Sequence, residues 1–283
     1  MTQPALHIPN QAEPIHVYHA NGFPAEVYLP FLNELAHLFD VHAIHGRATR
    51  ENAGEPKHKN WQIYADDLID YLEQTQSQPI IAIGHSMGAS STVLAAVKRP
   101  DLFKALVLIE PAMLNFSKRM LLNLMPKSMI NNMRLVKGTA QKPDTWEDAK
   151  TYKRYIKKFK GYAKFSEEAF DTFAKHAIKR TSTNQVTLRF PNKWEAYNYT
   201  NPPYLMGQFK KLERLGIPTI AVRGETNGFF NDSLWQTWQT SQPSALFLQN
   251  KNYGHLMPLE APIDSAQLII DGLKQLNIIE NTK

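Results

Sequence analysis

The sequence predicts an α/β protein whose mostly parallel sheet carries helices on both faces and is interrupted by an inserted helical segment. Short apolar runs alternate with longer amphipathic ones, which is the pattern of strand–helix–strand units. The apolar runs are nearly continuous, as expected for parallel strands buried on both faces. The alternation stops over residues 112–200 and then resumes, so the insertion divides one sheet into two parts.

The composition is that of an ordinary globular protein. The chain has 283 residues, of which 43% are hydrophobic, and this excludes a disordered chain. It has no cysteine, which excludes a disulfide scaffold, a Cys-ligated zinc site, a thiol nucleophile and an iron–sulfur cluster. The net charge of +6 is unevenly distributed, because residues 118–180 hold 16 Lys and Arg against 6 Asp and Glu, a balance of +10 that leaves −4 elsewhere.

The expected elements follow the chain in order. Strands are expected at Pro14–Ala20, Phe39–Ile44, Pro79–Ile83, Ala105–Ile109, Pro218–Arg223 and Ala245–Leu248. Amphipathic helices are expected near Glu26–Leu38, Trp61–Glu73, Met87–Arg99 and Ile263–Leu273. This gives a first part of the core in residues 1–111, a helical cap in residues 112–200 and a second part of the core in residues 201–283.

The strongest motif lies between the third expected strand and the helix that follows it. It reads Gly84-His85-Ser86-Met87-Gly88, a G-x-S-x-G pattern at a strand-to-helix turn. Such a turn strains the serine backbone and lifts its hydroxyl out of the sheet, and the flanking Gly84 and Gly88 must be small because they approach one another. The backbone N–H of Met87, at the helix N-terminus, is directed to where an oxyanion would form. We therefore expect Ser86 to be a nucleophile.

With this motif in this context, the chain resembles the serine hydrolases of the α/β-hydrolase fold, of the esterase and lipase type with a helical cap. The resemblance covers roughly residues 14–111 and 203–276 in the order of motifs. It implies an α/β-hydrolase fold with the mostly parallel sheet and inserted cap expected above. Two further motifs lie where the family has them.

The first of these follows the first strand and reads His19-Ala20-Asn21-Gly22-Phe23-Pro24, similar to the family's H-G-x-P oxyanion loop with extra residues between His and Gly. The resemblance implies that Gly22 lets the backbone approach the substrate and that the Phe23 N–H is the second oxyanion donor. The other follows the last strand and resembles the family's histidine loop, G-H-x-x-P-x-E-x-P, which implies that His255 is the base.

The acid that would orient His255 is less clear from the sequence. The family usually has an aspartate where this chain has Asn227, and an amide cannot stabilise an imidazolium by charge. Three interpretations stay open. Glu110 ends an apolar strand and is the first choice, because a partly buried carboxylate needs a partner. Glu225 could reach from the neighbouring position, and Asn227 could serve as the orienting residue of a weakened dyad.

Two other patterns in the sequence, histidine pairs and a basic aromatic segment, do not indicate a metal or nucleic-acid site. His16 and His19, like His42 and His45, are three residues apart, which puts the two rings of each pair on opposite faces of a strand. We therefore expect no metal and no cofactor. The lysines and aromatic residues of segment 150–165 are expected to form a solvated helix face rather than a nucleic-acid surface.

The chain start lacks a secretory pattern and no run is long enough to span a membrane, so we expect a cytoplasmic protein without stable membrane insertion. The sequence gives no indication of the oligomeric state.

The expected function is hydrolysis of carboxylic esters of small or medium apolar molecules through an acyl-enzyme. Methionines and leucines at the start of the cap either line an apolar cleft over Ser86 or dock the cap on the core. The basic residues around them could attract an anionic group or a membrane surface. Alternatives within the same fold are a carbon–carbon bond hydrolase, a thioesterase and an amidase or aminopeptidase. A ligand-binding protein that has lost efficient turnover is an alternative of another class, supported by Asn227.

Overall fold

A central sheet of seven strands organises the computed structural model, which describes residues 4–50 and 53–280. The strand order is β1-β3-β2-β4-β5-β9-β10, and every neighbouring pair is parallel except β1 and β3. The strands are β1 (Ala5–Ile8), β2 (Pro14–Tyr18), β3 (Asp40–Ile44), β4 (Ile80–His85), β5 (Phe103–Ile109), β9 (Thr219–Arg223) and β10 (Leu246–Gln249). The predicted α/β class and mostly parallel sheet are confirmed.

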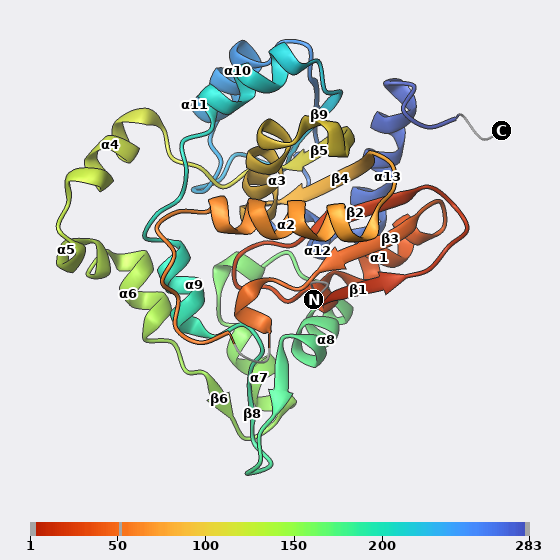
Figure 1. Ribbon diagram of the computed structural model, residues 1–283. Helices are drawn as coiled ribbons and strands as arrows, with labels where there is room; N and C mark the ends of the chain where they lie inside the picture. The colour runs from red at the N-terminus through yellow and green to blue at the C-terminus, as the bar shows by residue number, and fades with distance from the viewer. Residues whose placement is uncertain (1–3, 51–52, 281–283) are drawn as a thin grey trace.

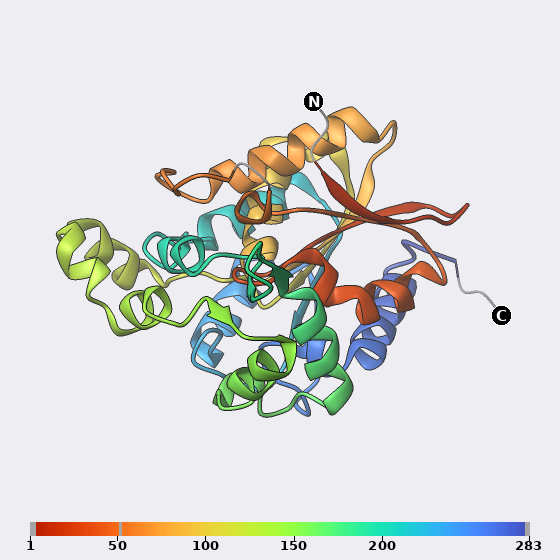
Figure 2. The same cartoon turned by 90° about the horizontal axis from the view of Figure 1, so that it is seen from below.

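Helices cover both faces of this sheet, as Figures 1 and 2 show. The helices on one face are α1 (Leu29–Ala36) and α13 (Pro262–Gln275). Those on the other face are α2 (Gln62–Thr75), α3 (Met87–Lys98), α10 (Met206–Leu215) and α11 (Asp232–Ser241). The strands alternate accordingly: on β4, Ile81 and Ile83 join the core cluster on one side and Ile80 and Ala82 the cluster on the other.

Among the described residues, the insertion between β5 and α10 contains six α-helices, a short 3-10 helix at Lys160–Tyr162 and a small antiparallel sheet. Its helices are α4 (Phe116–Leu124), α5 (Lys127–Asn131), α6 (Arg134–Ala140), α7 (Ala149–Ile156), α8 (Glu167–His176) and α9 (Asn192–Asn198). Its strands, in the order β6-β8-β7, are β6 (Thr145–Trp146), β7 (Ile178–Arg180) and β8 (Val186–Leu188). The expected helical cap is therefore present, but it also holds a sheet whose two- and three-residue strands are too short to give a sequence periodicity.

Strand β4 is two residues longer at its carboxyl end than the sequence analysis predicts. It continues through Gly84 and His85 because both pair with β5, in the register Gly84↔Leu108 and His85↔Ile109. The strand thus runs directly into Ser86. The carboxyl ends of β4, β5 and β9 meet at one edge of the sheet, and the candidate site lies there.

Candidate active site

Ser86 lies at a tight turn between β4 and α3. Its backbone has φ 54° and ψ −114°, in the left-handed half of the map that a non-glycine residue adopts only under constraint. The turn has no room for side chains beside it. A Cβ on Gly84 would lie 2.4 Å from the Cα of Ala89, and one on Gly88 would lie 2.1 Å from the Tyr18 carbonyl oxygen. The small residues required around Ser86 are therefore explained by direct backbone contact.

His255 reaches Ser86 from the loop between β10 and the short helix α12 (Met257–Glu260). Its Nε2 lies 3.1 Å from Ser86 Oγ, within hydrogen-bond distance. The loop is closed by Glu260, whose carboxylate accepts a 2.6 Å hydrogen bond from the Gly254 N–H. Burial raises the pKa of Glu260, while this N–H favours its ionised form.

Glu110 completes a continuous line of hydrogen bonds. It follows β5 with a φ of 41°, it is fully buried, and its Oε2 lies 2.6 Å from His255 Nδ1. The Gly224 N–H donates to Oε1 at 2.9 Å, and the Asn227 side-chain amide donates to Oε2 at 2.9 Å. Both carboxylate oxygens are thus satisfied, as a buried charge requires.

The three candidate acids of the sequence analysis therefore have different surroundings. Glu110 contacts the imidazole, whereas Asn227 donates to Glu110 and supports it. Glu225 is half exposed and forms an ion pair with Lys164 at 2.8 Å. Asn227 stands where the family usually has its aspartate, and its amide donates to Glu110. The two residues are far apart in the sequence, so no local motif indicates that they pair.

The expected oxyanion donors are Phe23 and Met87. Met87 is the first residue of α3, so its N–H has no acceptor within the helix. The Phe23 N–H donates to the Ala20 carbonyl at 3.4 Å, a long hydrogen bond in the turn that Gly22 makes with a φ of 86°. The Phe23 ring packs edge-on against Phe173 of cap helix α8, with 5.4 Å between centroids. The Phe23 side chain thus packs the oxyanion loop against the cap.

His85 links three loops of the site, which the sequence analysis did not foresee. Burial lowers the pKa of His85 to about 3, so its ring is neutral at ordinary pH. Its Nε2 donates to the His255 carbonyl at 2.8 Å, and its Nδ1 therefore accepts from the Tyr28 hydroxyl at 2.6 Å. The same hydroxyl accepts a 3.1 Å hydrogen bond from the Ala20 N–H. Tyr28 carried no signal because it lies far from His85 and His255 in the sequence.

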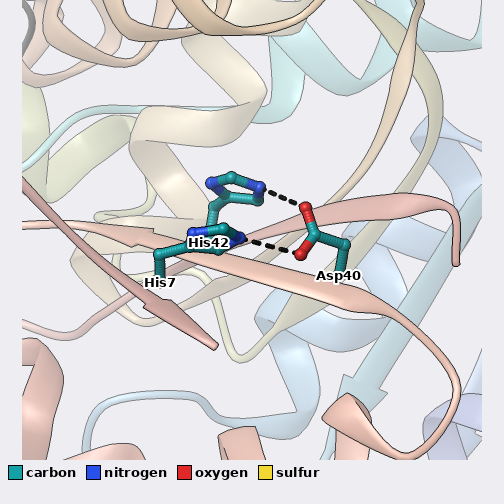
Figure 3. A group of neighbouring side chains, drawn as sticks. All are labelled: His7, Asp40 and His42. Carbon is teal, nitrogen blue, oxygen red and sulfur yellow. Dashed lines mark hydrogen bonds and ion pairs between the residues drawn. The ribbon is translucent and has the colours of Figure 1, made fainter. Parts of the chain in front are cut away.

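A second group of titratable side chains lies at the opposite end of the sheet, at the beginning of β3. Figure 3 shows His7 and His42 directed to the two carboxylate oxygens of Asp40, at 2.8 Å and 2.7 Å. Residues His7 and His42 are direct partners in the β1–β3 ladder. The sequence pattern compares His42 only with His45, three residues on, because no strand is predicted over β1. This cluster is remote from Ser86 along the strands and is not part of the candidate active site.

Within the described ranges 4–50 and 53–280, no helix is both long enough and apolar enough to cross a membrane.

Known proteins with similar sequences include lipases and hydrolases, and also karrikin insensitive 2 receptors of Petunia hybrida. The sequence profile of the α/β hydrolase fold family matches residues 16–262. The chain is 31% identical over 77 residues to a monoglyceride lipase of Rattus norvegicus, a match covering 26% of this chain and 24% of the lipase. It is 29% identical over 97 residues to a 2-(acetamidomethylene)succinate hydrolase of Mesorhizobium japonicum, covering 33% and 34%. The chain thus matches only a quarter to a third of the length of these relatives.

Solved structures extend the likeness over nearly the whole chain. A crystal structure of E-2-(acetamidomethylene)succinate hydrolase has a TM-score of 0.78 at 17% identity and covers 95% of this chain and 94% of that one. A thermophilic esterase from Thermogutta terrifontis has a TM-score of 0.70 at 17% identity, covering 96% and 93%. At such identities the likeness is one of fold. Together with the profile match over most of the sequence, it confirms the resemblance drawn from the motifs, and the chain belongs to the α/β hydrolase fold family.

Proposed function

We propose that this protein is a serine hydrolase that cleaves carboxylic esters of small or medium apolar molecules through an acyl-enzyme. The observation that carries the proposal is the unbroken hydrogen-bonded line from the Glu110 carboxylate through His255 to the Ser86 hydroxyl. A nucleophile, a base in contact with it and a buried carboxylate on the far side of the base are the three parts that nucleophilic acyl transfer requires.

The proposed reaction begins with attack of Ser86 Oγ on the ester carbonyl, while His255 Nε2 takes the serine proton. The oxyanion of the tetrahedral intermediate accepts hydrogen bonds from the N–H groups of Phe23 and Met87. The long bond from Phe23 to the Ala20 carbonyl is readily exchanged for a stronger one to a charged oxygen. Nε2 then gives its proton to the leaving alkoxide, and the acyl group remains on Ser86.

In the second half of the reaction, His255 Nε2 deprotonates a water molecule, which attacks the acyl carbonyl. Collapse of the intermediate returns the proton to Ser86 and releases the carboxylic acid. Glu110 orients His255 and stabilises the imidazolium formed in each half. The hydrogen bonds that it accepts from the Gly224 N–H and the Asn227 amide hold its carboxylate beside His255.

The ester assignment rests on the relatives named as lipase and esterase, and the apolar substrate on the surroundings of the base. Phe229 stacks on the His255 ring, with 5.0 Å between centroids and 24° between planes. An apolar group next to the base excludes water and strengthens the electrostatic interactions within the site.

Labelling with a fluorophosphonate probe tests the nucleophile. The wild-type chain is expected to label, and Ser86→Ala to lose all labelling. Ser91→Ala is the matched control, because its hydroxyl lies in the same helix and bonds only to the Met87 carbonyl among the described residues. A correctly folded wild type that never labels would overturn the proposal in favour of a ligand-binding protein.

A panel of p-nitrophenyl esters of rising acyl length then tests the substrate class. We expect kcat/KM to rise with chain length before it falls. Matched thioester and anilide substrates belong in the same panel, and a higher kcat/KM for either than for the ester of the same acyl group would replace the ester assignment by a thioesterase or an amidase.

A further inference from the structure

The first three helices of the cap form a protruding arm, which we define as α4, α5 and α6, residues 116–140. Figures 1 and 2 both show α4 and α5 at the outer edge of the molecule, away from the central sheet. Twelve large apolar side chains are exposed among the described residues, and seven of them lie in this arm. These seven are Phe116, Met120, Leu121, Leu124, Met129, Met133 and Leu135. Such a concentration of exposed apolar groups marks an interaction surface.

Helix α4 is apolar on two opposite sides. Leu122 is its buried residue and faces the protein. The exposed apolar residues Phe116, Met120 and Leu124 are spaced by four, and together with Leu121 they span about 140° of the helix circumference. Leu122 lies on the other side of the helix from this stripe. At one end of the stripe, Phe116 packs edge-on against Tyr204, with 5.6 Å between ring centroids. Leu121 and Leu124 are nevertheless 61% and 78% exposed, so most of the stripe faces solvent.

The charge of the arm is of one sign. Its 25 residues contain five basic side chains and no aspartate or glutamate. The basic residues are Lys118, Arg119, Lys127, Arg134 and Lys137. In the part of the chain that the structure describes, none of these five forms an ion pair. An apolar stripe flanked by cations alone is the composition of helices that lie in the surface of an anionic membrane.

We infer that the arm docks on the surface of a bilayer that contains anionic phospholipid, with the stripe in the headgroup region and its four exposed cations at the lipid phosphates. The fifth, Arg119, is partly buried and donates to the Pro202 carbonyl. A second copy of the chain fits less well. A symmetric contact between two arms would bring ten positive charges together without a counter-charge, and this repulsion opposes association.

The root of the arm is attached to the candidate active site. The Ala112 N–H donates to the Ser86 carbonyl at 3.1 Å, and the Leu114 N–H donates to the Pro203 carbonyl at 2.9 Å. The chain therefore enters the arm directly from the elbow of Ser86. Docking itself needs no catalysis, so Ser86→Ala is expected to bind vesicles as the wild type does, and this separates the present inference from the proposed hydrolase function.

Co-sedimentation of the full chain with sucrose-loaded vesicles tests the inference. The probes are phosphatidylcholine vesicles with and without one third phosphatidylglycerol. The wild type is expected to sediment with the anionic vesicles and much less with the neutral ones. The double variant Leu121→Glu/Leu124→Glu is expected to bind at least about tenfold more weakly. Its matched control is Leu215→Glu/Ile263→Glu, which changes two exposed apolar residues outside the arm and is expected to bind as the wild type does.

The cations are tested in the same assay. Lys118→Gln, Lys127→Gln and Lys137→Gln combined are expected to weaken binding to the anionic vesicles at least about tenfold. The control combines Lys57→Gln, Lys210→Gln and Lys211→Gln, which are exposed and outside the arm. Circular dichroism confirms that each variant is folded before binding is measured.

Three results would overturn the inference. One is equal binding of the arm variants and their controls. Another is equal sedimentation of the wild type with neutral and anionic vesicles. The third is a wild type that ignores vesicles but forms a dimer in light scattering, which Leu121→Glu/Leu124→Glu converts to monomer, because the arm would then be a contact between copies.

Discussion

The neighbouring strands β4 and β5 both run into a residue with an unusual backbone conformation, but one then leads into a buried helix and the other into an exposed one. Each is followed by a residue with a positive φ, 54° for Ser86 and 41° for Glu110. After Ser86 the chain enters α3, in which nine of twelve residues are buried. Soon after Glu110 it enters α4, in which Leu122 alone of nine residues is buried. The core surrounds the first helix on most sides and leaves the second largely in solvent.

This difference shows that the fold fixes the backbone at Ser86 and Glu110, whereas the exposed surface of α4 can change without disturbing the core. A strained backbone persists only where its surroundings over-determine it, and Ser86 and Glu110 are both held by bonds from adjacent strands. The Ser86 N–H donates to the Ile109 carbonyl and the Glu110 N–H to the Val222 carbonyl, each at 2.9 Å. In the arm, α6 packs on α9 and buries Val136 and Thr139, whereas α4 buries only Leu122 and α5 buries no residue. The chemistry and the docking of this protein can therefore be changed independently, and each prediction below tests that separation.

The largest effect is expected at the buried end of β5. Glu110→Gln should lower kcat by about 10³ to 10⁴. Glutamine can still accept from the Gly224 N–H, but its NH₂ would face the Asn227 amide and His255 Nδ1, and it cannot stabilise an imidazolium. Ester hydrolysis measured at saturating substrate tests this expectation.

The control for this change is Glu225→Gln, which removes a half-exposed carboxylate two residues from Asn227. It should leave kcat within a few-fold of the wild type, because an exposed ion pair contributes little. A nearly active Glu110→Gln together with an inactive Glu225→Gln would reverse the assignment of the acid. Vesicle binding by the arm should be the same in both variants.

The second effect compares one glycine of the elbow with one of the arm. Gly88→Ala puts a methyl group 2.1 Å from the Tyr18 carbonyl oxygen, so backbone must move, and we expect a loss of about 3 kcal/mol or more in the free energy of unfolding. Gly138→Ala, in α6, meets nothing within 4 Å and should raise that free energy by about 0.5–1 kcal/mol. Urea unfolding of both variants measures these free energies. Equal decreases in the free energy of unfolding would mean that the arm is packed as tightly as the elbow.

The core and the elbow of Ser86 could be predicted from the sequence, because buried strands and the elbow each give a recognisable local pattern of residues. Parallel strands buried on both faces give apolar runs that stand out, and Gly84 and Gly88 are separated from Ser86 by one residue each, a local pattern. The edge strand β1 was missed because it has four residues, most of them partly exposed, and lies outside the alternation. The cap sheet was missed for the same reason of length.

The site was predictable only as far as its parts are local. Choosing Glu110 over Glu225 depends on a positive φ after β5 and on an amide that arrives from residue 227, more than a hundred positions later. The Tyr28–His85 bond likewise joins residues that are 57 positions apart. Sequence patterns identify which residues can carry a role, whereas the contacts that select among them are made by tertiary packing.

The third effect is a pH dependence confined to the core. Burial, followed by the nearby charges of His42 and His19, lowers the pKa of His16 to about 3, and burial likewise lowers that of His85 to about 3. The unfolded chain therefore binds more protons than the folded one from about pH 6.5 downward, so the free energy of unfolding must fall as the pH falls. From about pH 7 to about pH 5 the loss is up to about 2 kcal/mol for each such histidine.

His16→Gln tests this pH dependence. Glutamine can still accept the hydrogen bond that His16 Nε2 takes from the Ile44 N–H, but it does not titrate. The decrease in stability between about pH 7 and about pH 5, measured by urea unfolding, should be smaller in the variant. An equal decrease in both proteins would contradict the pKa assignment. The arm contains no histidine or carboxylate, so its vesicle binding should persist at the lower pH.

The smallest effect on stability is expected on the exposed stripe of α4. Leu124 is 78% exposed, so Leu124→Ala should change the free energy of unfolding by less than about 0.5 kcal/mol. Leu122→Ala, two residues earlier on the same helix, removes the buried contact and should cost about 2 kcal/mol or more. Both changes delete the same atoms from one helix, at positions two residues apart, so the difference between them reports mainly on burial. If Leu124→Ala costs as much as Leu122→Ala in solution without lipid, the stripe is already covered by protein, and the arm is a packed part of the fold rather than a free surface.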